Sequence, residues 1–259
     1  MLVVGGFFSQ STCTTKHLRL FSINNNSNNN NNEHEQLKEI ISFSIPSILE
    51  SKSTFASIVT DSNILYIFGG TTKYDYSNQL FSIDIEKLLK KYFNKDDNIN
   101  EQHITITEED ISKLDCISNL KFSCTSTAST TDVNKKEMIV GRRGVSGIYD
   151  KKRNRFIVYG GYTSQSFATS QVISFDLTTL TYSYLCDNDT NHNSKNNHPE
   201  ARYFHRTHYW DDKLWIFGGK TNTNTNNNNV NKQILNDLWS FDLATNQWNC
   251  IFNNEINSS

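Results

Sequence analysis

The sequence has little proline and no long apolar run. Its two prolines, Pro46 and Pro199, both lie in links that precede a predicted strand. No run of about 18 or more apolar residues occurs, so no membrane-spanning helix is expected. The apolar start of the chain, Met1–Val4, is short and is not preceded by basic residues, so we do not predict a signal peptide. The formal net charge is −2, so the chain lacks the excess of basic residues that is typical of nucleic-acid binders.

Cysteine is sparse, and the cysteines do not have the spacing of a disulfide framework. The chain has five cysteines, an odd number with no Cys-x-x-Cys pair. They are Cys13, Cys116, Cys124, Cys186 and Cys250. This usage favours mostly buried thiols in a reducing compartment over a disulfide framework. We therefore predict a cytoplasmic location, with the nucleus as an alternative.

Motifs that carry chemistry are also missing. The sequence contains no Walker loop, Gly-x-Gly-x-x-Gly, nucleophile elbow or His-Glu-x-x-His. His205 and His208 are three residues apart on a predicted strand, so they point to opposite faces and do not easily share a metal ion. We predict no catalytic residue, no metal site and no cofactor.

Glycine pairs, by contrast, recur along the chain, and each follows four apolar residues. The pairs are Gly5 and Gly6, Gly69 and Gly70, Gly160 and Gly161, and Gly218 and Gly219. A short apolar run that ends at glycine predicts a strand buried on both faces. The glycines then allow a sharp turn with positive φ and a close approach of the backbone. The pairs are farther apart than the roughly 40–50 residues of propeller repeats, which indicates insertions.

Two further signatures follow each glycine pair. A serine two residues before an aspartate marks a second strand that ends at Asp84, Asp176 or Asp242, with Asn24 in the first copy. The aspartate can accept backbone N–H groups in the next turn. An aromatic residue six positions later, Tyr182 or Trp248, marks another strand. With a strand before each glycine pair, the unit is a four-stranded meander of about 45 residues.

The last copy carries the fullest pattern. It runs from Pro199-Glu-Ala-Arg202-Tyr-Phe-His205 through Leu214-Trp-Ile-Phe-Gly-Gly219 and Asp237-Leu-Trp-Ser-Phe-Asp242 to Trp248. This order resembles the kelch repeat, one blade of a β-propeller. The resemblance implies an all-β fold of about four blades, one of them incomplete. Propellers of this kind usually have about five to seven blades. We therefore expect an open arc or partial propeller.

The resemblance divides the chain into blades separated by insertions. Blade one covers 1–44 and lacks its first strand, blade two covers 51–130 with an insertion at about 86–115, blade three covers 139–186, and blade four covers 200–253. A short helix is expected at 86–93. The Asn-rich tracts 24–32 and 222–231 are predicted to be solvated loops between strands, because loop-closure entropy rises slowly with length.

Aromatic and charged residues gather on loops that the meander places at one end of the blades. They are Phe7, Phe8, Lys73, Tyr74, Tyr76, Tyr162 and Phe167. Such residues on loops above a rigid scaffold form a candidate partner-binding surface, although half of them could instead pack under their own loops. A second set could line a central channel and bind a carboxylate or phosphate, or could satisfy carbonyls between blades. It consists of Arg142, Arg143, Arg202 and His205.

The kelch resemblance implies a protein–protein interaction scaffold. It suggests cytoskeletal proteins, ubiquitin-ligase components or small-GTPase pathway components as partners, and the sequence selects none of them. The alternative is an enzyme or small-ligand binder that uses the central channel. We do not expect an enzyme, a nucleic-acid partner or a membrane partner.

Overall fold

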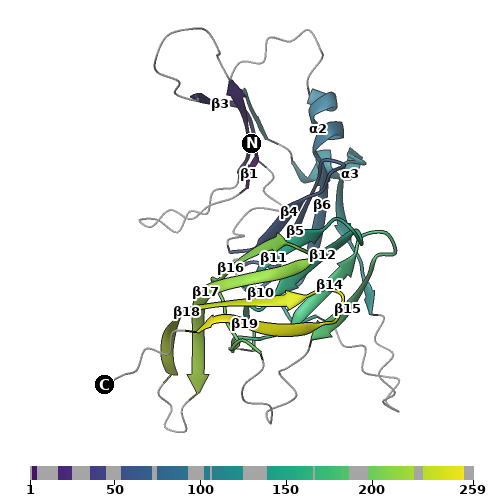
Figure 1. Cartoon of the computed structure of the whole chain (residues 1–259). Helices are drawn as coiled ribbons and strands as arrows, with labels where there is room; N and C mark the ends of the chain where they lie inside the picture. Colours follow the sequence, from purple (N-terminus) through teal and green to yellow (C-terminus); the bar gives the residue numbers. More distant parts are fainter. Residues whose placement is uncertain are drawn as a thin grey trace. The chain divides into compact units, whose positions relative to one another are not determined.

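A computed structural model describes most of the chain (Figure 1). The described residues are 2–4, 17–24, 36–44, 54–71, 75–92, 102–105, 107–124, 139–165, 167–186, 198–224 and 230–253. They fall into two compact units. One unit consists of Met1–Ser53 with Ile83–Ser118, and the other of Thr54–Ser82 with Asn119–Ser259.

The first unit contains a sheet with the strand order β1-β2-β3-β7. Its strands are β1 (Leu2–Val4), β2 (His17–Asn24), β3 (Gln36–Ser44) and β7 (Gln102–Thr105). The first three strands pair antiparallel, whereas β7 pairs parallel with β3. Because β7 lies inside the insertion predicted for blade two, this segment differs from the prediction by adding a strand to blade one.

Two helices also belong to the first unit. They are α2 (Ile85–Tyr92) and α3 (Glu108–Lys113). The predicted short helix is confirmed by α2. The carboxylate of Asp84 accepts a hydrogen bond from the N–H of Lys87 (2.9 Å), which caps the helix start. Lys90 and Glu86 form an i,i+4 ion pair (2.6 Å) that supports the helix further.

Three sheets stand at the places predicted for blades two to four. In blade two, the order is β4 (Ala56–Val59), β5 (Ile64–Phe68), β6 (Leu80–Asp84) and β8 (Ile117–Leu120). In blade three, it is β11 (Ser146–Asp150), β12 (Arg155–Tyr159), β14 (Val172–Asp176), β15 (Thr181–Cys186) and β9 (Ser123–Cys124). In blade four, it is β16 (Arg206–Trp210), β17 (Lys213–Asn224), β18 (Val230–Asp242) and β19 (Gln247–Asn253). Two short strands of blade three, β10 (Arg142–Arg143) before β11 and β13 (Tyr162–Thr163) after β12, pair antiparallel with each other.

In blades two and three, the strand before the glycine pair carries the core. In β5 and β12 the apolar residues are buried on both faces, as predicted. Blade four differs, because Phe217 is 52% exposed although Phe68 and Tyr159, at the same place in blades two and three, are both 0% exposed. The prediction of burial on both faces is therefore wrong for β17. One face of β5 and one face of β12 are covered by the next blade, and no further blade follows β19 among the described residues.

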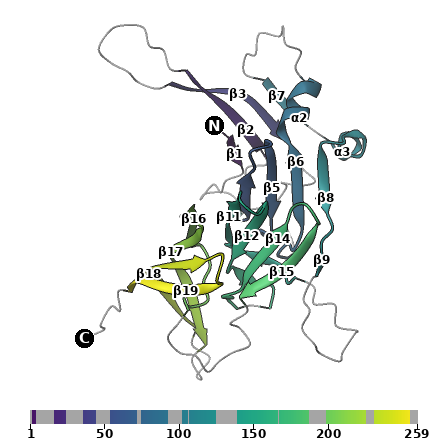
Figure 2. The same cartoon turned by 45° about the vertical axis from the view of Figure 1, so that its right-hand side comes forward.

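Two apolar clusters hold the blades of the second unit together. Between blades two and three, the ring of Phe68 packs on Phe175, with centroids 4.9 Å apart. Between blades three and four, the ring of Tyr159 lies 5.3 Å from Trp248, which in turn contacts Phe241 at 4.8 Å. Figure 2 shows the sheet of β16–β19 beside the sheet of blade three. Burying these large side chains removes apolar area from water and is the main stabilising contribution between blades.

The glycine pairs bring successive blades into backbone contact. Gly160 and Gly161 have φ of 65° and 106°. The N–H of Gly161 donates to the carbonyl of Arg202 in the next blade (2.8 Å), as Gly70 donates to Arg142 (2.8 Å). A Cβ on Gly160 would lie 2.6 Å from the Arg202 oxygen, closer than atoms pack. The pair is therefore needed both for its turn and for the room that it leaves.

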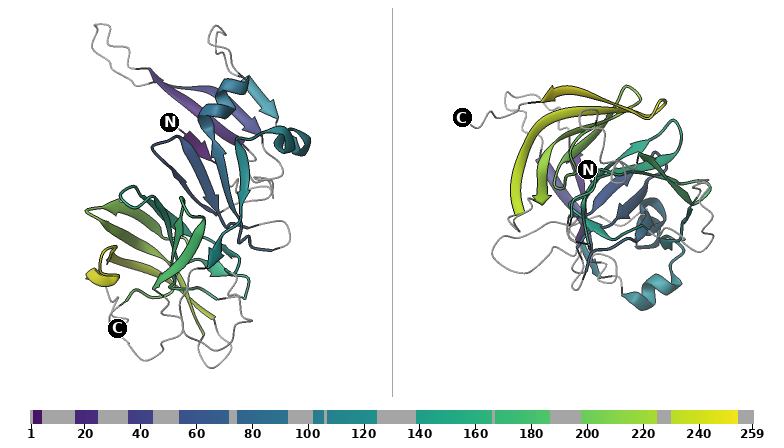
Figure 3. Two further views of the ribbon diagram at one scale, coloured as in Figure 1. Left: turned by 90° about the vertical axis from the view of Figure 1, so that its right-hand side faces the viewer. Right: turned by 90° about the horizontal axis from the view of Figure 1, so that it is seen from below.

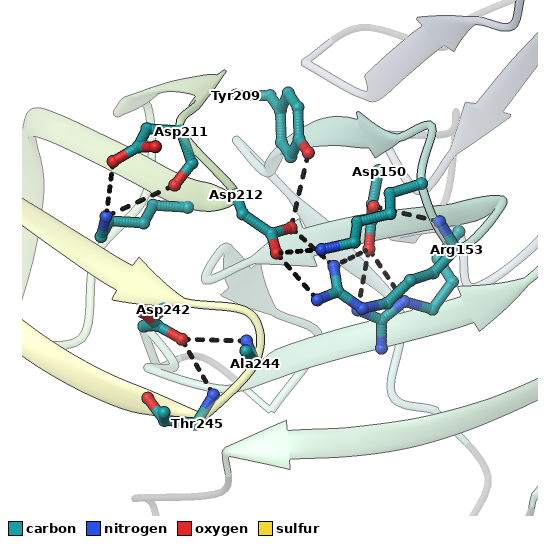
Figure 4. A network of polar contacts seen from close by, with 11 residues as sticks. Asp150, Arg153, Tyr209, Asp211, Asp212, Asp242, Ala244 and Thr245 are labelled. Atoms are coloured by element: carbon teal, nitrogen blue, oxygen red, sulfur yellow. Dashed lines mark hydrogen bonds and ion pairs between the residues drawn. The ribbon is translucent and has the colours of Figure 1, made fainter.

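The aspartates that end the third strands act in the turns that follow. Asp242 Oδ1 accepts hydrogen bonds from the N–H groups of Ala244 (2.9 Å) and Thr245 (2.8 Å), as Figure 4 shows. Asp176 makes the same two bonds with Thr178 and Thr179. These bonds, from Thr245 first and then Ala244, hold the pKa of Asp242 below its ordinary value.

The Asn-rich tract at 222–231 differs from the prediction. β17 continues to Asn224 and β18 begins at Val230, and the register pairs Asn222 with Lys232 and Asn224 with Val230. Figure 3 shows this extension as a long, curved, yellow-green hairpin. The described residues of this tract, 222–224 and 230–231, are therefore strand, because the ladder depends on backbone groups that every residue other than proline supplies. Of the tract 24–32, Asn24 ends β2, and the rest lies outside the described residues.

Candidate functional site

Arg142 and Arg202, predicted as channel-lining residues, are buried. In both, Nε donates to the carbonyl two residues earlier, and Nη1 donates to the first glycine of the same blade's pair. For Arg202 these distances are 2.9 Å to Glu200 and 3.0 Å to Gly218. The two residues are 1% and 0% exposed, and they satisfy carbonyls of their own blades rather than carbonyls between blades.

Each buried arginine also binds a side chain of its own blade, Asp237 within β18 for Arg202 and Gln171 just before β14 for Arg142. Arg202 forms a two-pronged ion pair with Asp237, with Nη1–Oδ1 at 2.5 Å and Nη2–Oδ2 at 2.7 Å. Arg142 uses Nη2 to bind Oε1 of Gln171 (2.9 Å). Burial alone would raise the pKa of Asp237, but the Arg202 guanidinium and the Trp239 indole N–H lower it below its ordinary value. The pair is thus a charged, internal brace of blade four.

His205 is also buried, and it contacts blade three. Its ring lies 5.1 Å from the ring of Tyr159, edge to face. Burial, with the positive charges of Arg202 and Arg206, lowers the pKa of His205 to about 3, although the Tyr159 backbone favours the charged form. Neither ring nitrogen meets hydrogen-bond geometry. His205 is therefore a neutral packing residue rather than a channel ligand.

Arg143 has a different setting from its neighbour Arg142. Its guanidinium carbon lies 5.0 Å from the ring centroid of Tyr76 and 5.4 Å from that of Tyr162. The two tyrosine rings also contact each other edge to face at 6.1 Å. All three side chains are half-buried, so their remaining surface faces solvent. A guanidinium between aromatic faces is stabilised by cation–π attraction and has its planar group fixed in direction.

The aromatic contact continues into blade four. Tyr162 packs on Tyr203 with ring centroids 5.2 Å apart, and Tyr203 packs on Phe204 at 5.0 Å. Tyr203 is buried, whereas Phe204 is 41% exposed. We call these five residues, from blades two, three and four, the aromatic ridge: Tyr76, Arg143, Tyr162, Tyr203 and Phe204.

The backbone beneath the aromatic ridge is linked from blade to blade. Thr54, Gly144 and Phe204 occupy matching places before the first strands, with φ of 60°, 64° and 59°. The N–H of Gly144 donates to the carbonyl of Thr54, and the N–H of Phe204 donates to the carbonyl of Gly144, both at 2.7 Å. Tyr203 and Lys220 also exchange two backbone bonds (2.9 and 2.8 Å). The ridge therefore stands on hydrogen-bonded backbone.

The residues predicted as a partner-binding surface divide into three groups. Tyr76 and Tyr162 lie together in the aromatic ridge, joined by Arg143 from the predicted channel set. Phe167 is exposed, and its carbonyl accepts a bond from the N–H of Thr163 (2.9 Å). The remaining predicted positions, including the first glycine pair, lie outside the described residues: Gly5, Gly6, Phe7, Phe8, Lys73 and Tyr74.

Tyr203 and Phe204 were not predicted as surface residues. Tyr203 directly follows Arg202, as Arg143 directly follows Arg142. That shared register was the signal available in the sequence, because equivalent positions of stacked repeats lie on neighbouring blades.

The opposite end of β12 carries a network of charged residues (Figure 4). Arg153 donates to Asp212 of blade four through Nη1 (2.7 Å) and Nη2 (2.9 Å), and to Asp150 (3.1 Å). Arg155 also binds Asp150, and Lys152 binds Asp212. The Arg153 hydrogen bonds hold the pKa of Asp212 far below its ordinary value. These ion pairs tie blade three to blade four, so we interpret the network as structural.

The described residues contain no group of three or more histidine, cysteine, aspartate or glutamate side chains placed to hold a metal ion. None of the helices described here has the length and apolar character needed to cross a bilayer.

Comparison with known proteins agrees with the repeat pattern. A family model for the KLHDC2/KLHL20/DRC7 Kelch-repeats domain matches residues 107–257, which is more than half of the chain. A search of curated proteins found no match. The glycine-pair turns, antiparallel sheets and family match agree, and the chain belongs to the kelch-repeat family, with its sheets as blades of a kelch-type β-propeller.

Proposed function

We propose that the chain is a protein–protein interaction scaffold that binds its partner through the aromatic ridge. Membership of the kelch-repeat family supports a protein-interaction propeller in general. The observation that carries the finer proposal is the half-buried Arg143, whose guanidinium carbon lies over the rings of both Tyr76 and Tyr162. Tyrosine, tryptophan and arginine dominate the binding energy of protein interfaces, because they offer large contact areas and directed hydrogen bonds.

The hydrogen-bonded backbone beneath the aromatic ridge favours binding in which the ridge side chains do not first have to be ordered. Gly144 and Phe204 continue a backbone hydrogen-bond chain that begins at Thr54. Side chains held in this way lose little conformational entropy when a partner docks, and so more of the contact energy contributes to affinity. Arg143 is further limited by the two rings that flank it.

The channel alternative has no supporting observation among the described residues. Arg142, Arg202 and His205 are buried, and the two arginines use their donors within the sheets. The proposed partner is therefore a protein, met in the cytoplasm or nucleus. Cytoskeletal, ubiquitin-ligase and small-GTPase pathway proteins are the candidates that the kelch resemblance suggests.

The experiment compares the full chain with an Arg143→Ala variant by affinity purification from native cells and quantitative mass spectrometry. The expected result is a specific set of proteins that falls by about tenfold or more with Arg143→Ala, since loss of an interface hot spot costs about 2 kcal/mol or more. Tyr162→Ala should deplete the same set, because it removes one of the flanking rings.

Trp210→Ala is the matched control, because Trp210 is exposed on blade four and is not part of the ridge. It should retain the set. Thermal unfolding of each variant checks that the blades remain folded. The proposal is refuted if folded Arg143→Ala and Tyr162→Ala variants recover the same partners at the same yield as the wild type.

A further inference from the structure

One face of the blade-four sheet carries exposed aromatic side chains. Phe217 is 52% exposed, Phe252 is 45% exposed and Trp210 is 62% exposed. The ladder puts Phe217 beside Leu238 and Leu238 beside Phe252, and the ring of Trp210 contacts that of Trp215 (5.7 Å). We call this surface the open face of blade four. Exposed apolar side chains that adjoin one another in this way mark an interaction surface.

The open face continues the series of contacts between blades. Phe68 of blade two packs on Phe175 of blade three, and Tyr159 of blade three packs on Trp248 of blade four. Phe217 has the same place before its glycine pair, yet half of its surface is exposed. The apolar residues of β5 and β12 are buried on both faces, so these strands offer no free face to cover it. The open face therefore has the character of a surface that meets another sheet.

The two central strands of the open face carry complementary side chains. In the ladder of β17 and β18, Lys213 lies opposite Asp242, and Phe217 lies opposite Leu238. A two-fold axis along these strands, midway between two facing sheets, sets β17 of one copy over β18 of the other. Lys213 then faces Asp242 of the second copy, and Phe217 faces Leu238. Opposite charges and apolar groups thus match when the face meets itself.

The two outer strands match in the same arrangement. Arg206 of β16 is exposed and lies beside Phe217, whereas Phe252 of β19 is at the same level on the other side of the sheet. The axis that sets β17 over β18 also sets β16 over β19. The guanidinium of Arg206 then lies over the ring of Phe252 of the second copy, which is a favourable cation–π arrangement.

We propose that the open face of blade four binds the open face of a second copy of this chain, with β17 over β18 about a two-fold axis. The aromatic side chains provide the buried centre, and Lys213 with Asp242 fixes the register. The contact is separate from the aromatic ridge and does not depend on it.

The size of the open face fits a weak, reversible dimer. It spans four strands, of which β16 has five residues. With strands about 4.8 Å apart and about 3.3 Å per residue, the flat area is roughly 300 Å². Side-chain relief raises the buried area to about 1,000 Å² for both copies together, near the lower limit of specific interfaces. The expected dissociation constant is therefore about 10 μM or weaker.

Sedimentation velocity of the full chain from about 1 μM to about 200 μM tests the proposal. The expected result is a reversible shift from monomer to dimer. Phe217→Lys puts a charge at the centre of the face and should abolish the dimer over this range. Phe167→Lys, the same change at a 40% exposed phenylalanine of blade three, is the matched control and should dimerise as the wild type does.

Lys213→Glu tests the arrangement, because it places a carboxylate opposite Asp242 of the second copy. It should weaken the dimer by about tenfold or more, and added salt should reduce the difference. Lys220→Glu, at an exposed position of β17 beyond the open face, is its control and should keep the wild-type dissociation constant.

A wild-type chain that stays monomeric at the highest concentration overturns the proposal. A dimer that Phe217→Lys leaves intact, or an equal effect of Lys213→Glu and Lys220→Glu, also overturns it. Thermal unfolding identifies the other occupant. A monomer that Phe217→Lys destabilises would assign the cover of the open face to this chain itself and not to a second copy.

Discussion

At the scale of single residues, matching positions in successive blades have taken different roles. Arg142 and Arg202 are buried braces that bind the first glycine of their own blades. The next residue is Arg143 in blade three and Tyr203 in blade four, and both contribute to the aromatic ridge. One step along the chain thus separates a buried brace of the blade from a residue of the aromatic ridge.

His205 provides a test at this scale. Its folded pKa of about 3 is below the ordinary value of 6.5, so below pH 6.5 the unfolded chain binds a proton that the folded chain does not. The contribution of neutral His205 to the stability of the fold is fully present above about pH 6.5 and is lost as the pH falls toward 3. At pH 5 the loss is about 2 kcal/mol. His205→Val, which copies Val145 of blade three, should remove this loss.

Urea unfolding at pH 7 and pH 5 measures the effect. The expected result is a smaller decrease in the free energy of unfolding for His205→Val than for the wild type. His208→Val, at an exposed position of β16, is the matched control and should keep the wild-type difference. An unchanged pH dependence in His205→Val would show that His205 is not the buried neutral group described above.

Gly144 tests the packing beneath the aromatic ridge. Its φ is 64°, and a Cβ at this position would lie 2.9 Å from Cδ1 of Phe204. Gly144→Ala is expected to destabilise the fold by about 1–3 kcal/mol, from the disfavoured backbone conformation and the close contact. Phe204→Ala removes the ring, so the double variant should lose less than the sum of the two changes. Strict additivity in chemical denaturation would contradict the contact.

At the scale of elements, the turn after each third strand depends on its aspartate. Asp242 accepts bonds from the N–H groups of Ala244 and Thr245. Asp242→Ala should lower the free energy of unfolding by about 1 kcal/mol, whereas Asp242→Asn keeps an acceptor and should lose less. Thermal unfolding measures both variants, and equal losses for alanine and asparagine would show that the accepted bonds do not stabilise the turn.

The elements also show which features the sequence could predict. Glycine pairs, strand ends and the aspartate turns depend on residues within a few positions of one another, and their periods are visible in the chain. The pairing of β7 with β3 and of β9 with β15 joins segments far apart in sequence. No local period marks such pairings. The strands through Thr221–Asn224 were missed because their composition indicates a loop, although the backbone pairs normally.

At the scale of the whole molecule, the candidate site arises from stacking. Tyr76, Tyr162 and Tyr203 belong to three blades and become neighbours because sheets pack through the clusters of Phe68 with Phe175 and Tyr159 with Trp248. The sequence predicted Tyr76 and Tyr162 as loop residues of one surface. It could not place Arg143 between their rings, since that contact depends on the position of one blade against the next.

The most direct test of the proposed scaffold is isothermal titration of a purified partner, identified as above, into the wild-type chain and into Arg143→Ala. The account predicts a dissociation constant at least about tenfold weaker for Arg143→Ala, in a variant that thermal unfolding shows to be folded, because the guanidinium lies on the aromatic ridge. An equal dissociation constant for the two proteins would contradict it and would place partner binding elsewhere on the chain.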